Sequence, residues 1–167
     1  KKKIFQTLSK ITKKLNLYNA TIKGDLIIKK NKIYVIEIAT RLSGGWLSTI
    51  TIPNSTGVDI LEYTIKNSLK MGIKEKELIP KFKKKIIQRY LFPKVGRINS
   101  IQLKNRSLLN DKDILSFKIF VKKGQIIEKI DSHASRIGHV IVRNSNFKKG
   151  ILHANKILNN VEIKYSK

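Results

Sequence analysis

Three short runs of the sequence decide the fold: Gly24-Asp25-Leu26-Ile27-Ile28, then Lys30-Asn31-Lys32, then Ile33-Tyr34-Val35-Ile36-Glu37-Ile38. The outer runs are rich in β-branched and aliphatic residues, and the middle run is a polar turn signal. We therefore predict an antiparallel hairpin with strands over residues 20–29 and 32–39.

Asp25 and Glu37 each lie six residues from Asn31, which is their midpoint. If the turn centres on Asn31, the two carboxylates face each other across adjacent strands, with Cβ atoms about 4.5–5.5 Å apart. Alternation along the strands then puts Ile33 and Val35 on the face of Glu37. Two like charges so placed repel unless a cation lies between them. Such a pair suits Mg²⁺, which one or two carboxylates hold together with phosphate and water oxygens. The alternative, a pair of solvated strand residues near lysines, stays open on these residues alone.

Arg41, Gly44 and Gly45 follow the second run and extend the candidate site. The alternation places Arg41 on the face of Glu37, where its guanidinium can bind a phosphate or carboxylate as a fork. Gly44 and Gly45 offer backbone N–H groups to an anion. Two alternatives stay open: Arg41 pairs with a nearby carboxylate, and the two glycines only make a turn.

The hairpin and the loop after it resemble the metal-binding hairpin of the ATP-grasp ligases, the superfamily of biotin carboxylase and carbamoyl phosphate synthetase. The resemblance implies that Asp25 and Glu37 are the ligands of the Mg²⁺ (or Mn²⁺) that accompanies ATP. In the family an Asn, a further metal ligand, commonly follows this Glu by two positions. Here that position is Ala39, which puts tight binding of two metals in doubt.

The same resemblance implies an activity. ATP-grasp ligases of this kind activate a carboxylate by phosphoryl transfer, and an amine or similar nucleophile then displaces the phosphate. Arg41 matches the motif's arginine, which implies a catalytic contact with phosphate or acyl phosphate. With Gly44 and Gly45 it would also contact the nucleotide. The implied partners are ATP, a small carboxylate substrate and a nucleophile.

The resemblance covers the C-terminal half of such an enzyme. Residues 1–80 are expected to be the C-terminal part of the ATP-grasp catalytic domain, and residues 81–167 a small α+β capping subdomain. Because an upstream lobe that would clamp ATP is not recognisable, we expect the chain by itself to be inactive, as a piece of a longer protein would be. Whether the protein forms a homodimer is left open.

The fold class predicted from the whole chain is α+β, with antiparallel strands and helices on one side. Residues 41–53 are expected to be a loop, and residues 74–85 a basic connector. The remaining predicted elements are helices over residues 3–16, 57–72 and 146–158, and strands over residues 86–92, 95–103, 114–121, 139–143 and 161–165.

Composition excludes several classes of function. The chain has 167 residues and no Cys, which excludes disulfides, thiolate catalysis and Cys-based zinc sites. No apolar run approaches the roughly 20 residues that a membrane span needs. The basic start has no apolar run after it, so it is not a signal peptide, and we expect a cytoplasmic location.

The charge of the chain leaves one alternative function open. Lys and Arg number 36 against 11 Asp and Glu, a net charge of +25. Such a charge can mark a nucleic-acid-binding module. We consider nucleic-acid binding the weaker interpretation, because the excess of basic residues is almost all Lys and is scattered along the chain. Recognition of bases and phosphates favours Arg. A further alternative, an inert structural C-terminal domain, is kept open by Ala39 at the position of the usual Asn.

The three histidines, His133, His139 and His153, are too scattered to form a metal site local in sequence. We expect His139 and His153 to be structural. Residues 132–136 are polar and are expected to form a turn between strands, with contact to a substrate as the alternative.

Overall fold

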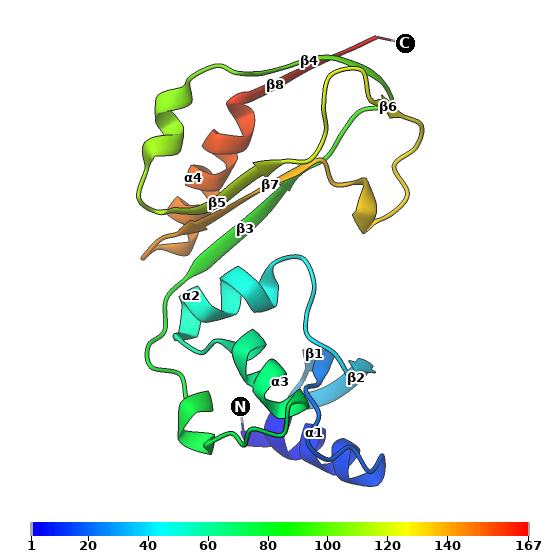
Figure 1. The fold of residues 1–167 in the computed structure, drawn as a ribbon, viewed down its shortest axis with the longest axis vertical. Helices are drawn as coiled ribbons and strands as arrows, with labels where there is room; N and C mark the ends of the chain where they lie inside the picture. The colour runs from blue at the N-terminus through cyan, green and yellow to red at the C-terminus, as the bar shows by residue number, and fades with distance from the viewer. Residues whose placement is uncertain (1, 167) are drawn as a thin grey trace. The chain divides into compact units, whose positions relative to one another are not determined.

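The computed structural model describes residues 2–166. The chain divides into two compact units, residues 1–81 and 82–167, each built from helices and antiparallel strands (Figure 1). The predicted α+β fold class is therefore confirmed. Within the described part of the chain, no helix is both long and apolar enough to cross a membrane.

The first unit holds one hairpin and several helices. Its elements are α1 (Lys2–Lys14), β1 (Lys23–Lys29), β2 (Lys32–Ala39), a π-helix (Leu47–Thr51), α2 (Ile52–Thr56), α3 (Ile60–Ser68) and a 3₁₀ turn (Glu75–Leu78). The hairpin strands carry no buried residue, and their apolar side chains are largely exposed. The hairpin is thus a surface element whose shape is set by its turn and its ladder.

The hairpin turn is one residue shorter than the polar triplet predicted. Lys29 pairs with Lys32, so only Lys30 and Asn31 connect the strands. Both have positive φ, 46° and 61°. This is the backbone that two-residue hairpin turns require, and Asn tolerates it better than most residues. The turn therefore centres between Lys30 and Asn31, and the prediction that it centres on Asn31 is wrong.

A β-bulge follows at Ile36. Leu26 pairs with Val35 and Asp25 pairs with Glu37, so Ile36 is the extra residue between two pairs. The bulge shifts the register by one residue, which offsets the shorter turn. Asp25 consequently stands opposite Glu37, as the sequence predicted, although by a different route.

The bulge overturns the predicted alternation of side chains along β2. Tyr34 pairs with Ile27, which lies on the same face of β1 as Asp25. Tyr34 therefore shares the face of the carboxylate pair. Ile33 and Val35 lie on the opposite face, because the bulge separates them from the period of Glu37.

The helices after the hairpin also differ from the prediction. The expected loop over residues 41–53 contains the π-helix and the start of α2. The helix expected over residues 57–72 is only α3. Gly57, with φ of 77°, ends α2, and the Asp59 side chain accepts a hydrogen bond from the Glu62 N–H to start α3.

The second unit contains two three-stranded sheets, in the orders β3-β7-β5 and β6-β4-β8. Asn146 caps α4 by accepting a hydrogen bond from the Lys149 N–H, and α4 lies close to the predicted helix over residues 146–158. The strand β6 was not predicted, because two residues give no periodicity. The elements are β3 (Ile86–Leu91), β4 (Gly96–Leu103), a 3₁₀ turn (Arg106–Asn110), β5 (Ile114–Ile119), β6 (Ile126–Ile127), a 3₁₀ turn (His133–Ser135), β7 (Gly138–Arg143), α4 (Phe147–Asn159) and β8 (Val161–Ser166).

The core of the second unit lies between α4 and the sheet of β3, β7 and β5 (Figure 1). Its buried members are Ile87, Val140, Val142, Ala154 and Ile157. A Cβ at Gly150 of α4 would overlap the end of the Ile87 side chain, so glycine allows α4 to approach β3 closely. This packing buries most of β7, which is the middle strand of its sheet.

Candidate functional site

The carboxylate pair lies on the exposed hairpin of the first unit. Asp25 on β1 and Glu37 on β2 are direct partners in the ladder. Their side chains are half exposed, at 52% and 49%. Both carboxylates are thus accessible to solvent and to a ligand.

A lysine of this chain lies between the two carboxylates. Lys23 Nζ is 2.6 Å from Asp25 Oδ2 and 3.4 Å from Glu37 Oε1. The hydrogen bond to Asp25 is the main cause that raises the pKa of Lys23, and the charges of both carboxylates add to it against the opposing effect of burial. The repulsion that the sequence predicted between the carboxylates is relieved here by an ammonium group.

Sequence reasoning did not single out Lys23. The signal was present, since Lys23 precedes Asp25 by two residues and alternation puts both side chains on one face. It was obscured because lysines are so frequent in this chain.

Arg41 lies beyond the end of β2, next to Glu37. Its Nη2 is 3.7 Å from Glu37 Oε1, and its Nη1 donates a hydrogen bond to the Leu42 carbonyl at 3.2 Å. Pairing with a carboxylate, one of the alternatives left open, is thus present. The side chain is 58% exposed, so the guanidinium keeps donors available for a ligand. Its contact with phosphate stays a prediction.

Gly44 and Gly45 lie in the turn that leads into the π-helix. Gly45 and Trp46 have left-handed backbones, with φ of 62° and 64°. The Gly44 carbonyl accepts a hydrogen bond from the Leu47 N–H at 3.3 Å, and no neighbouring atom crowds the space beside its Cα. The structure thus combines a turn with open backbone, and nucleotide contact by this loop stays a prediction.

The donor set of the hairpin fits a hard divalent cation that is bound together with another ligand. Mg²⁺ takes oxygen donors and keeps several positions for phosphate and water. Among residues 2–166 no group of three or more His, Cys, Asp or Glu side chains could enclose a metal. Asp25 and Glu37 could therefore supply only part of a coordination shell, as a nucleotide-bound metal requires.

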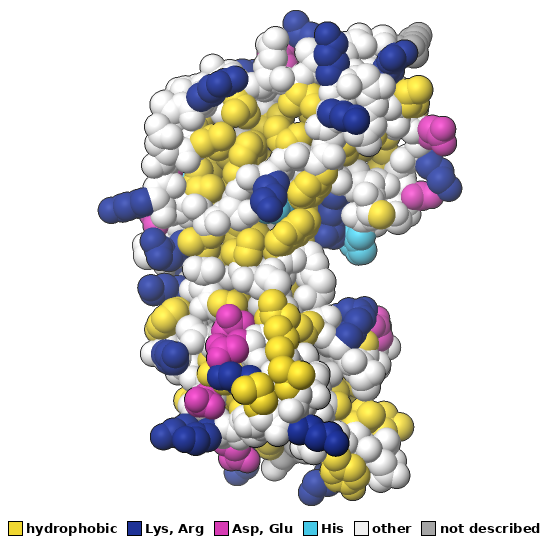
Figure 2. Space-filling view, viewed as in Figure 1, with side chains coloured by type: hydrophobic (Ala, Val, Ile, Leu, Met, Phe, Trp, Pro, Cys, Tyr) yellow, Lys and Arg dark blue, Asp and Glu magenta, His cyan; other side chains and the backbone are white. Residues whose placement is uncertain are grey.

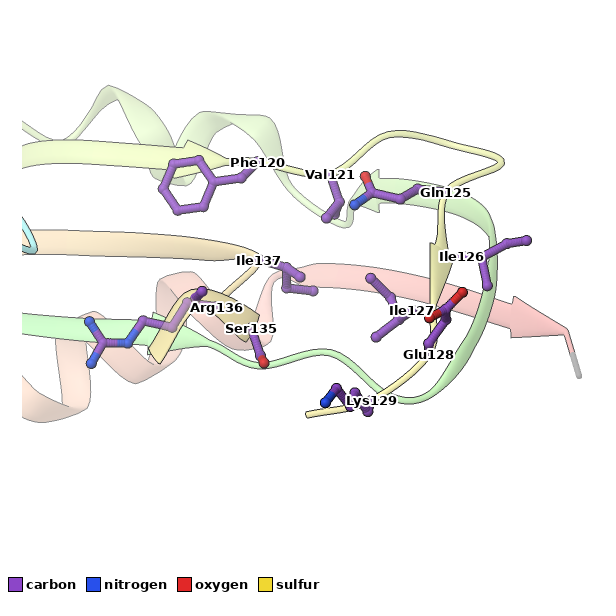
Figure 3. Close-up of a pocket in the computed structure, with 11 residues that line it drawn as sticks. Phe120, Val121, Gln125, Ile126, Ile127, Glu128, Lys129, Ser135, Arg136 and Ile137 are labelled. Carbon is purple, nitrogen blue, oxygen red and sulfur yellow. The ribbon is translucent and has the colours of Figure 1, made fainter. Parts of the chain in front are cut away.

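The second unit has a separate pocket of about 440 Å³ (Figure 3). Segments before β6, after it and before β7 line the pocket, and Val121, Ile127 and Ser135 are among the lining residues. In Figure 3 the Arg136 side chain extends away from Ile127. Its guanidinium lies 3.6 Å from the centre of the Tyr90 ring.

Arg136 is also held by a neighbour in the preceding 3₁₀ turn, since its Nη2 is 2.6 Å from His133 Nδ1. Ser132 caps that turn by accepting a hydrogen bond from the Ala134 N–H. The expected turn between strands is therefore present over residues 132–136. Its arginine is engaged in packing, which gives the substrate-contact alternative no support.

The other histidines have structural surroundings. His139 is fully buried in β7, and its Nε2 lies 2.7 Å from Ser116 Oγ. Burial, together with the charge of Lys118, lowers its pKa. His153 on α4 lies 3.2 Å from an Asp111 carboxylate oxygen. The expectation that both are structural agrees with these contacts.

Basic side chains are distributed widely over the surface. On the face that Figure 2 shows, Lys and Arg side chains are spread over both units rather than gathered in one patch. A nucleic-acid-binding surface normally concentrates them along one face or groove. The visible distribution gives that alternative no support.

The comparisons with known proteins differ in the part of the chain that they cover. Residues 89–166, most of the second unit, match the family model of the L-amino acid ligase C-terminal domain 2. Comparison by sequence with curated proteins finds no match. Solved structures match across both units, including the hairpin.

Phosphoribosylglycinamide synthetase from Anaerococcus prevotii is similar with a TM-score of 0.77 and 24% identity, over 95% of this chain and 40% of that chain. L-amino acid ligase from Bacillus licheniformis is similar with a TM-score of 0.77 and 15% identity, over 98% of this chain and 40% of that chain. This chain has the fold of the C-terminal part of an ATP-grasp ligase. The fold that the resemblance implied is thereby confirmed.

A third similar structure contains bound ligands. The biotin carboxylase domain of Hydrogenobacter thermophilus 2-oxoglutarate carboxylase, in complex with MgADP, ADP and bicarbonate, is similar with a TM-score of 0.65 and 20% identity. That likeness covers 93% of this chain and 34% of that chain. The chain thus spans well under half the length of the ATP-grasp ligases that it resembles.

Proposed function

We propose that the chain is the C-terminal part of an ATP- and Mg²⁺-dependent ligase, which activates a carboxylate as an acyl phosphate for attack by an amine or similar nucleophile. The observation that carries the proposal is the pairing of Asp25 with Glu37 on an exposed hairpin in a chain with the ATP-grasp fold. In this proposal residues 1–80 belong to the catalytic domain and residues 81–167 form a capping subdomain.

Asp25 and Glu37 would hold the Mg²⁺ or Mn²⁺ of the nucleotide. When bound, the metal would neutralise negative charge on the phosphate oxygens during phosphoryl transfer. The half-exposed carboxylates support this role, because a bound metal would keep positions for phosphate and water. The bulge at Ile36 holds the two carboxylates in register.

Arg41 would stabilise the acyl phosphate or orient the carboxylate substrate. Its guanidinium lies beside Glu37 and is more than half exposed, so it could bind an anion next to the metal. Gly44 and Gly45 would add backbone N–H groups toward the phosphates. These roles place positive charge and donors where negative charge develops.

The family that matches residues 89–166 suggests a substrate class. Because its name refers to L-amino acid ligases, we favour an amino acid as the carboxylate, the nucleophile or both. We also propose a cytoplasmic ligase, with a homodimer as one assembly to test, and we expect residues 1–167 alone to be inactive.

The test replaces Glu37 in the full polypeptide that contains these residues. Glu37→Gln should lower ATP turnover roughly a hundredfold at fixed Mg²⁺, because a metal ligand loses its charge. Glu162→Gln, an exposed carboxylate on β8, is the matched control and should leave turnover unchanged. Unchanged turnover and Mg²⁺ dependence in Glu37→Gln would contradict the proposal.

A further inference from the structure

Four residues of the hairpin form two neighbouring cross-strand pairs. Lys23 stands opposite Ala39, and Asp25 stands opposite Glu37. Residues two apart on a strand, and direct partners across an antiparallel ladder, share one face of the hairpin. The lysine, the two carboxylates and the alanine therefore lie together on one face.

Lys23 differs from the other lysines of the hairpin. Its side chain is only 19% exposed, whereas Lys29, Lys30 and Lys32 are exposed residues. Its ammonium lies 2.6 Å from one carboxylate and 3.4 Å from the other. The small methyl group of Ala39 opposite leaves room for the lysine stem to cross toward Glu37.

We infer that Lys23 is the resident cation of the Asp25–Glu37 pair and that a divalent metal must displace its ammonium group to bind there. The inference rests on the proposed role of these carboxylates as metal ligands. Lys23 already satisfies Asp25 Oδ2 and approaches Glu37 Oε1, which are oxygens that a metal would need. The same ammonium would repel a doubly charged ion that entered beside it.

The charge of Lys23 allows an estimate of how much this side chain weakens metal binding. A unit charge and a divalent ion about 4 Å apart interact appreciably even in an environment close to water, although salt weakens the effect. Replacing Lys23 with a neutral side chain of similar length should therefore tighten metal binding on the order of tenfold. Replacing a lysine far from the pair should not.

The experiment titrates the full polypeptide that contains these residues with Mn²⁺, in the presence of an equimolar non-hydrolysable ATP analogue, and measures free Mn²⁺ by electron paramagnetic resonance. The variants are Lys23→Met, Lys29→Met at the far end of the same strand as matched control, Glu37→Gln, and Lys23→Met combined with Glu37→Gln. Circular dichroism verifies that each variant is folded. We expect about tenfold tighter binding in Lys23→Met, no change in Lys29→Met, and loss of the gain in the double variant.

The outcomes separate the inference from the proposed function. If the native chain and Lys23→Met bind Mn²⁺ equally and Glu37→Gln weakens both, the inference is overturned while the metal role of the pair stands. Weaker binding in Lys23→Met also overturns it, because the lysine would then organise the carboxylates instead of competing. If Glu37→Gln changes nothing in either background, the metal role and the inference fall together.

Discussion

Asp25 stands opposite Glu37 across the hairpin because a bulge at Ile36 compensates for a two-residue turn. Neither feature alone would give this pairing. With the same turn and no bulge, the regular ladder would place Asp25 opposite Ile36 and turn Glu37 to the other face. The geometry of the candidate site therefore depends on the backbone at both ends of the hairpin.

The first prediction concerns the turn that sets this register. Asn31 has φ of 61°, which strains a β-branched residue. Asn31→Val should destabilise the hairpin by about 1–2 kcal/mol. Amide hydrogen exchange along β1 and β2 should become about 5–30-fold faster. NMR can measure this, and Asn31→Gly, which suits the left-handed backbone, is the control that should leave exchange close to native.

The hairpin shows how far sequence could predict the site. Apolar runs around a polar turn were sufficient to predict the strands, and the carboxylate spacing was sufficient to predict the pairing. The turn uses the left-handed backbone of Lys30 and Asn31, and composition specifies neither this backbone nor the bulge at Ile36. The face assignment of Ile33 and Val35 failed for this reason, since one extra residue reverses the alternation.

The helices of the first unit were harder to predict for a related reason. The apolar periodicity over residues 57–72 does indicate a helix, but Gly57 ends one helix and Asp59 starts another, so the cap residues set the bounds. In the second unit, the periodicity of apolar residues predicted most helices and strands closely. The role of Lys23 was not predicted, because its alternation with Asp25 is obscured by the many other lysines of the chain.

The second prediction concerns the packing of α4 on β3. Gly150→Ala should destabilise the second unit by about 1–3 kcal/mol through overpacking, because the buried Ile87 and the Cβ of Asn144 leave no room for a methyl group. The higher helix propensity of Ala offsets about 1 kcal/mol of this loss. Urea unfolding followed by circular dichroism measures the balance. Ile87→Val removes the overlapping methyl group, so the double variant should recover most of the loss. If the two changes are simply additive, the close contact does not limit this packing.

The third prediction concerns pH. Burial lowers the pKa of His139 below its ordinary value of 6.5, so the unfolded chain takes up a proton at a higher pH than the folded chain. Stability is therefore fully present above about pH 6.5 and falls as the pH decreases below it, by at most about 1.4 kcal/mol per pH unit.

Urea midpoints at pH 7.5 and 5.5 measure this dependence. His139→Gln should flatten it, whereas His133→Gln, at an exposed histidine, should leave it in place. An equally steep dependence in His139→Gln would show that other groups cause the acid sensitivity.

The fourth prediction concerns the arginine beside the carboxylate pair. If Arg41 binds an anionic oxygen pair as a fork, its geometry matters as much as its charge, because a lysine cannot make two parallel hydrogen bonds from one plane. In the full polypeptide, Arg41→Lys should therefore lower kcat/KM by roughly ten- to a hundredfold, equivalent to about 1.4–2.7 kcal/mol of transition-state stabilisation. Arg106→Lys, at an exposed position of the second unit, is the matched control and should retain native kinetics. A distinct pattern, in which Arg41→Lys keeps native kinetics but Arg41→Met does not, would mean that Arg41 acts only as a positive charge near Glu37.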